Sequence, residues 1–235
     1  MNLPKPRACR RCDLEFQPVE EYQKDYCQTC EETIRDEERE KNLAAINKKI
    51  TEETPPRFLA TDTGHPAFNR MAWARIQAWK PTAENPWLGL VGATGTCKTR
   101  MAYLLAGRIL VDMAAESAMR RCRPPSFEFV SAYDIGAAVL DQFRDDRQAA
   151  ALSREFLSSV RKCRVLLLDD LGKCRFTPAV ASEFFALIDH RHENNMVTLW
   201  TSNSSPEEVA ATLPEDMAGP LAGRLNDCST IFKLK

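Results

Sequence analysis

The chain has 235 residues, enough to bury a sizeable core as one full domain with a small appendage. Its 32 basic and 33 acidic side chains nearly cancel, so net charge neither supports nor excludes nucleic-acid binding, and any such surface must be a local patch. No run approaches the roughly 18 apolar residues of a membrane span, and the start MNLPKPRACRRC lacks the apolar stretch of a signal peptide. We therefore expect a cytoplasmic protein with no membrane partner.

Residues 1–30 are predicted to form a small zinc-binding module. They contain paired cysteines but no apolar pattern that could fold the segment alone. Each pair has two residues between its partners, a spacing that suits four thiolates around one Zn²⁺, whereas disulfides are disfavoured in a reducing compartment. Zinc binding can supply folding free energy on the order of 10 kcal/mol. The predicted zinc ligands are Cys9, Cys12, Cys27 and Cys30.

Aromatic and basic residues are interleaved in this module. They are Phe16, Tyr22 and Tyr26, with Arg10, Arg11 and Lys24 close by. Such residues can stack on single-stranded DNA, cover the metal site or meet a protein partner. Of these, we slightly favour docking to a protein.

Residues 31–53 are expected to form a mostly solvated connecting helix. They are rich in helix formers, contain no glycine or proline, and carry only a thin apolar stripe of Leu43, Ile46 and Ile50. The prolines of TPPRF, which begins at residue 54, end this helix. Residues 54–235 are therefore predicted to be the main domain.

Short apolar runs alternate with helical patterns in the main domain. The runs are WLGLVGA, FEFVSA, RVLLLDDLG, MVTLWTSN and STIFKL. Helices are expected from residue 98 to about residue 120, after FEFVSA up to about residue 162, and after RVLLLDDLG up to about residue 194. A further short helix is expected after MVTLWTSN. This alternation predicts an α/β fold in which crossover helices connect parallel strands.

The stretch GATGTCKT predicts a phosphate-binding loop between a strand and a helix. In such a loop, backbone N–H groups surround the phosphates, the lysine reaches the terminal phosphates and the hydroxyl ligates Mg²⁺. The predicted nucleotide contacts are Gly92, Ala93, Thr94, Gly95, Thr96, Cys97, Lys98 and Thr99.

Cys97 departs from this motif because glycine normally precedes the lysine. Its N–H can still face phosphate, but its side chain must find room in a crowded turn. We expect nucleotide binding to survive and hydrolysis to be slower or to need assembly. A thiol at a helix N-terminus beside Lys98 is also expected to be sensitive to alkylation when nucleotide is absent.

Two aspartates, Asp169 and Asp170, follow the apolar run VLLL. Ligands of open α/β sheets bind at the carboxyl ends of the strands. We therefore expect Asp169 to hold Mg²⁺, directly or through water, and Asp170 to polarise the water that attacks ATP. The alternative is a strand that merely ends in acidic turn residues.

The stretches GATGTCKT, LLLDDLG, LWTSNSSPEEV and PLAGRLNDCSTIFKL resemble the DnaC and IstB group of AAA+ ATPases, which are helicase loaders and transposition helper proteins. The resemblance runs from about Pro55 onward and implies a three-layer AAA+ fold with a parallel sheet. It implies that Asn203 senses the γ-phosphate and that Arg224 reaches into a neighbouring subunit's site. The residues themselves also allow Asn203 to cap a helix and Arg224 to form a surface ion pair.

The chain ends eleven residues after Arg224, so we expect no full C-terminal lid and no sensor-2 arginine. Basic residues that could contact single-stranded DNA, or simply face solvent, are Lys173, Arg175, Arg120, Arg121 and Arg123.

The resemblance implies an ATP-dependent helicase loader in DNA replication. It would bind a replicative DNA helicase through its N-terminal region, form a homo-oligomer on ATP binding, and hold single-stranded DNA through the assembled domains. One alternative is an IstB-like transposition helper that acts on duplex DNA and a transposase. Another is a nonhydrolysing adaptor in which nucleotide has only a structural role.

Overall fold

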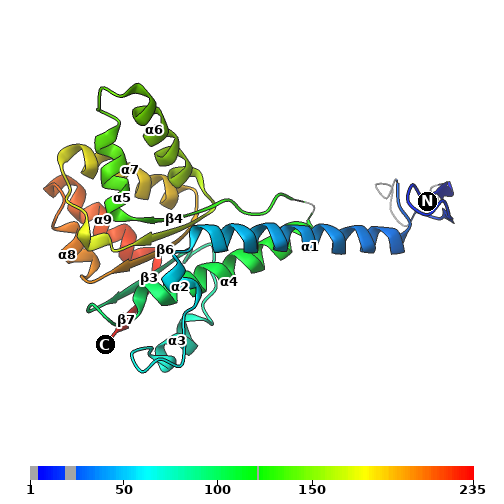
Figure 1. Ribbon diagram of the computed structural model, residues 1–235, viewed down its shortest axis with the longest axis horizontal. Helices are drawn as coiled ribbons and strands as arrows, with labels where there is room; N and C mark the ends of the chain where they lie inside the picture. Colours follow the sequence, from blue (N-terminus) through cyan, green and yellow to red (C-terminus); the bar gives the residue numbers. More distant parts are fainter. Residues whose placement is uncertain (1–4, 19–24, 121) are drawn as a thin grey trace. The chain divides into compact units, whose positions relative to one another are not determined.

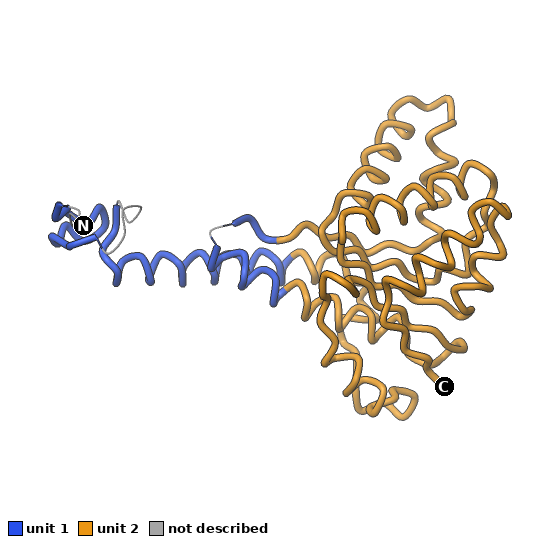
Figure 2. Tube along the Cα trace, turned by 180° about the vertical axis from the view of Figure 1, so that it is seen from behind, with its two compact units in different colours: residues 1–48, 111–124 blue, residues 49–110, 125–235 orange. Residues whose placement is uncertain are grey.

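The computed structural model describes residues 5–18, 25–120 and 122–235, so the predicted contacts Tyr22, Lys24 and Arg121 lie outside the described residues. The chain divides into two compact units (Figure 2). The smaller comprises residues 1–48 and 111–124, and the larger comprises residues 49–110 and 125–235. The predicted boundary at residue 54 stays a prediction about domains, although the division into units falls close to it.

The larger unit is built on a five-stranded parallel sheet, which confirms the predicted α/β class. The strands are β3 (Trp87–Gly92), β4 (Phe127–Ser131), β5 (Val165–Asp169), β6 (Val197–Ser202) and β7 (Ser229–Leu234), in the spatial order β4-β5-β6-β3-β7. They correspond to the five apolar runs of the sequence. β5 and β6 lie inside the sheet; the near-continuous apolar sequence of β5 fits a strand that is covered on both faces, and every residue of β6 is buried.

Helices of the larger unit cover both faces of this sheet (Figure 1). Along the whole described chain, the helices are α1 (Gln28–Glu53), most of which belongs to the smaller unit, α2 (Pro56–Leu59), α3 (Arg70–Ile76), α4 (Lys98–Met119), α5 (Ala132–Asp141), α6 (Arg147–Lys162), α7 (Pro178–Glu193), α8 (Pro206–Ala210) and α9 (Glu215–Asp227), with the 3₁₀ turn η1 (Leu171–Lys173) after β5. On one face, Leu166, Leu168 and Trp200 join a single core with buried residues of α5, α7 and α9. None of the described helices is long and apolar enough to cross a membrane.

Side-chain caps explain where several helices begin. Ser131, Asp146, Thr177 and Ser205 each accept a hydrogen bond from a backbone N–H in the first turn of α5, α6, α7 and α8. Ser205 and Glu208 form a full capping box on α8. Asn203 is therefore not the cap of that helix, and the capping alternative is wrong.

Three helical features were missed or misjudged from sequence. α2 and α3 lie in residues 54–86, where no element was assigned. The region after β6 holds both α8 and the longer α9, which has Pro220 inside it, instead of one short helix. α1 begins at Gln28 instead of residue 31 and so includes Cys30.

Candidate nucleotide site and cysteine cluster

The predicted phosphate-binding loop connects β3 to α4 with a backbone shape that few residue types can adopt. Gly95 has φ 89°, a left-handed conformation that favours glycine. Gly92 lies so close to the carbonyl oxygen of Leu234 that a Cβ at this position would collide with it. The Thr96 hydroxyl donates to the carbonyl oxygen of Ala93 at 2.9 Å, which closes the turn.

Cys97 also has a left-handed backbone, with φ 60°. This explains why glycine is the usual residue at this point of the motif, because a side chain in that conformation costs about 1–2 kcal/mol. The thiol donates to the carbonyl oxygen of Gly95 at 3.9 Å, and it lines the adjacent pocket. The side chain has therefore found room, and the cost of Cys97 lies in its backbone.

Lys98 connects the loop to the end of β6. Its Nζ is buried and donates to the carbonyl oxygens of Gly92 and Ala93 at 2.8 and 2.9 Å, and to Asn203 Oδ1 at 2.8 Å. Burial lowers the pKa of Lys98, although the nearby carboxylates of Asp170 and Asp169 oppose this effect. The predicted phosphate lysine and the predicted sensor are thus hydrogen-bonded to each other.

Thr99, at the start of α4, and Asp169, at the end of β5, are also hydrogen-bonded to each other. The Thr99 hydroxyl donates to Asp169 Oδ1 at 2.9 Å, and the Thr201 hydroxyl donates to the same oxygen at 2.6 Å. Burial raises the pKa of Asp169, while these two hydrogen bonds lower it. A hydroxyl beside a carboxylate is a donor set that suits Mg²⁺, so these residues fit the predicted ion.

Asp170 has a left-handed backbone with φ 57°, which turns it away from the strand direction. Its N–H donates to Thr201 Oγ1 at 3.0 Å, and its Oδ2 accepts a hydrogen bond from Lys173 Nζ at 2.7 Å. Thr201 therefore supports both aspartates, a role that sequence analysis did not assign. Its only signal was its position two residues before Asn203.

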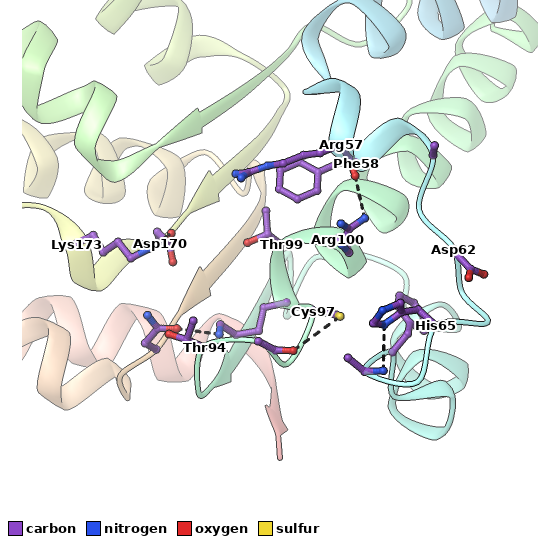
Figure 3. Close-up of a pocket in the computed structure, with 16 residues that line it drawn as sticks. Arg57, Phe58, Asp62, His65, Thr94, Cys97, Thr99, Arg100, Asp170 and Lys173 are labelled. Carbon is purple, nitrogen blue, oxygen red and sulfur yellow. Dashed lines mark hydrogen bonds and ion pairs between the residues drawn. The ribbon is translucent and has the colours of Figure 1, made fainter.

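A pocket of about 600 Å³ joins these residues (Figure 3). This is within the usual size range of small-molecule sites. The loop residues Thr94, Gly95, Cys97, Lys98 and Thr99, together with Asp170 and Asn203, line it. Its remaining wall comes mostly from α2 and the segment before α3, with Arg57, Phe58 and His65 among the lining residues.

Arg224 is absent from this pocket lining. It lies on α9, where its guanidinium pairs with Asp189 of α7 and stands 4.8 Å from the centre of the Phe185 ring. In this geometry Arg224 does not contact the pocket of its own chain. Its predicted role in a neighbouring subunit's site stays a prediction.

The four paired cysteines converge in the smaller unit. The strands β1 (Arg7–Ala8) and β2 (Glu15–Phe16) form a hairpin that carries Cys9 and Cys12, and Cys27 and Cys30 lie at the start of α1. Their Sγ atoms all lie within 4.8 Å of one another, and those of Cys12 and Cys27 are 3.7 Å apart. The main chains of Arg10 and Asp25 hydrogen-bond at 2.9 Å, which holds the two pairs together.

The pKa values of Cys9 and Cys30 in this cluster are shifted in opposite directions. Burial acts to raise the pKa of Cys9, but N–H groups of Cys27, Arg11 and Cys12 outweigh it and lower that pKa to about 6. Burial and the neighbouring thiols raise the pKa of Cys30 to about 12. Four thiols this close cannot all ionise without a cation among them, and their number and spacing fit a tetrahedral Zn²⁺.

A family model described as IstB-like ATP binding protein matches residues 31–234. Among solved structures, domain III of the replication initiation protein DnaA from Thermotoga maritima is 17% identical with a TM-score of 0.57, covering 77% of this chain and 69% of that one. The DnaI structure is 19% identical with a TM-score of 0.54, covering 77% and 95%. The DnaC helicase loader is 21% identical with a TM-score of 0.51, covering 77% and 100%.

At these identities the structural likenesses show the fold alone. The chain also spans less than half of the longer DnaA chains that it matches. The family match and the fold together confirm the predicted resemblance to the DnaC and IstB group and the predicted AAA+ fold.

Proposed function

Because the chain belongs to the IstB-like ATP-binding protein family and has an AAA+ fold, we propose that it is an ATP-dependent helicase loader in DNA replication. Nucleotide binding is the general property of the family. The proposal goes further in three respects: which residues hydrolyse ATP, which partners the protein binds, and that it forms a homo-oligomer.

The observation that carries the proposal is that Lys98, Thr99 and Asn203 line one pocket, with Asp169 hydrogen-bonded to Thr99 behind its lining. Bound phosphates would take over the hydrogen bonds that Lys98 now gives to its own loop. Thr99 and Asp169 would hold Mg²⁺, which neutralises the charge that develops on the phosphates. Asn203, released from Lys98, would orient the attacking water or contact the γ-phosphate.

Asp170 would act on the attacking water after it gives up its ion pair with Lys173. A carboxylate in this position can accept a hydrogen bond from the water and align it with the γ-phosphorus. Arg224 would leave Asp189 and stabilise the transition state in a neighbouring subunit, so that hydrolysis needs a homo-oligomer.

For the four-cysteine cluster, we propose that it binds Zn²⁺ and that the module docks on the replicative helicase. Two arginines near the cluster already have acidic partners, Arg10 with Asp25 at 3.2 Å and Arg11 with Glu37 at 2.6 Å. Paired arginines are less available for phosphates, which supports a protein partner over DNA for this module. Contact with single-stranded DNA is assigned to the assembled AAA+ domains, where Arg175 is exposed.

Capture of a replicative helicase by the full chain tests the loader function. We expect the parent to retain helicase and one zinc ion per chain, and Cys12→Ser/Cys27→Ser to lose both. Cys122→Ser, at an exposed cysteine outside the cluster, is the control and should retain both. Retention of a transposase instead would favour the transposition helper, and retention of neither would count against both functions.

ATP turnover in the presence of single-stranded DNA tests the nonhydrolysing adaptor. Measurable turnover by the parent that disappears in Asp170→Asn and in Arg224→Ala would exclude the adaptor. Nucleotide binding without turnover under any condition would support it.

A further inference from the structure

Arg57 lines the pocket described above, although it belongs neither to the phosphate-binding loop nor to the pair of aspartates. It lies on α2, in the stretch TPPRF, where the prolines gave the only sequence signal. In Figure 3, Arg57 and Phe58 lie on the α2 side of the cavity, opposite Thr94 of the loop. A nucleotide held by the loop would therefore face Arg57 on its other side.

The side chain and the backbone of Arg57 are both supported. Its guanidinium stands 4.5 Å from the centre of the Phe58 ring, and that ring stacks on Tyr103 at 4.9 Å. Arg100 Nη1 donates to the carbonyl oxygen of Arg57 at 2.8 Å, which fixes this turn of α2. A guanidinium stacked on a buried ring loses less conformational entropy when it binds a ligand than a free one does.

The charge of Arg57 is not neutralised in this pocket. Arg57 forms no ion pair with any carboxylate in the described part of the chain, whereas Asp170 is already paired with Lys173. The hydrogen bond to Asp170 is the main cause of the raised pKa of Lys173, and Arg57 is close enough for its charge to oppose that rise. A free positive charge thus lies near the end of the pocket where the phosphates would bind.

We propose that Arg57 contacts the terminal phosphates of bound ATP from the side opposite the phosphate-binding loop, within its own subunit, and is a further catalytic residue. This inference rests on the proposed function, because it requires that the pocket binds Mg²⁺-ATP. A guanidinium can donate to two phosphate oxygens at once, which a lysine cannot do in the same fixed geometry.

The contact from Arg57 would matter most in the transition state of hydrolysis, where negative charge moves onto the leaving group. The water oxygen bonds to the γ-phosphorus while the bond to the β–γ bridging oxygen breaks, and ADP keeps that electron pair. The proton of the water passes to phosphate or solvent. Arg57 would share the negative charge that moves onto the bridging oxygen, so it would act in the subunit that holds the ATP while Arg224 acts from the neighbour.

Binding of AMPPNP and of ADP to the full-length protein with Mg²⁺ tests this contact. We expect Arg57→Gln to weaken AMPPNP binding by about 10- to 100-fold, the usual worth of a hydrogen bond to a charged group. ADP binding should weaken clearly less than AMPPNP binding, because ADP lacks the γ-phosphate and keeps only the former β–γ bridging oxygen. Arg57→Lys should recover part of the AMPPNP affinity and tests the same point if Arg57→Gln folds poorly.

Arg75→Gln is the matched control. Arg75 is an exposed arginine on α3 whose guanidinium also stands over an aromatic ring, 5.6 Å from Phe232, but it lies outside the pocket lining. It should leave both affinities unchanged. Equal losses of AMPPNP and ADP in Arg57→Gln, or no loss of either, would overturn the inference alone, whereas a parent that binds neither nucleotide would overturn the proposed function and the inference with it.

Discussion

At the scale of single residues, Cys97 is a test of backbone strain. Cys97→Gly should remove a cost of about 1–2 kcal/mol from the left-handed conformation, offset by about 0.5–1 kcal/mol of backbone entropy. We expect a net gain of up to about 1.5 kcal/mol in the free energy of unfolding without nucleotide, measured by chemical denaturation. Cys122→Gly makes the same exchange at a residue without positive φ and should give no gain. A loss of stability in Cys97→Gly would contradict the prediction that the backbone of Cys97 is strained.

Asp169 should make the stability of the metal-free protein depend on pH. Burial raises its pKa above the ordinary value of 3.8, so the folded protein binds a proton more tightly than the unfolded chain does. Stability linked to this group therefore falls as the pH rises from about 4 through the raised pKa, because the ionised carboxylate is then buried. Asp170 adds to the rise and Lys173 opposes it.

The expected result is that Asp169→Asn melts at a higher temperature than the parent at pH 8 without Mg²⁺, and that the difference shrinks towards pH 4. The asparagine Oδ1 can still accept the hydrogen bonds from Thr99 and Thr201. Adding Mg²⁺ and ATP should stabilise the parent more than the variant. Asp145→Asn, at an exposed position, is the control; a parent and an Asp169→Asn variant with parallel pH profiles would contradict the prediction.

At the scale of elements, the start of α8 allows a structural side chain, Ser205, to be distinguished from a proposed functional one, Asn203. Ser205→Ala removes the capping box and should cost about 1 kcal/mol of stability while leaving ATP turnover per folded molecule unchanged. Asn203→Ala, two residues earlier, should lower turnover because the amide proposed to orient the attacking water or contact the γ-phosphate is lost. Denaturation and turnover measured on both variants check this; unchanged turnover in Asn203→Ala would remove its sensing role.

Much of the element pattern could be predicted from the sequence, because its signals are local. The five strands are apolar runs, and the phosphate-binding loop is a contiguous motif between a strand and a helix. The motif also marked Cys97 as unusual, and its positive φ gives the reason. The bounds of α4 lie within about a residue of the prediction for the same cause.

The second wall of the pocket could not be predicted, because it depends on which distant segments meet. Nothing in TPPRF indicates that Arg57 lines the same cavity as Lys98, about forty residues later. The ion pair of Arg224 with Asp189 likewise joins residues 35 positions apart. Thr201 lies in the buried strand β6, and nothing in the local sequence VTLWTS indicates that its hydroxyl supports both aspartates.

At the scale of the whole molecule, the proposed assembly can be tested by mixing two inactive variants. Asp170→Asn lacks the carboxylate of the site and Arg224→Ala lacks the residue donated to a neighbour, so each alone should show little ATP turnover. A mixture forms some interfaces where an intact site meets an intact Arg224, and turnover should reappear there. Turnover that stays absent in the mixture, although both variants assemble, would contradict a role for Arg224 between subunits.

The last strand of the fold has a practical consequence. β7 lies at the edge of the sheet, and the carbonyl oxygen of Leu234 fills the space beside Gly92 that a larger residue would need. A fluorophore attached at residue 235 would thus lie one residue from the contact with the phosphate-binding loop, and we expect its emission to change when nucleotide binds, without a label inside the pocket.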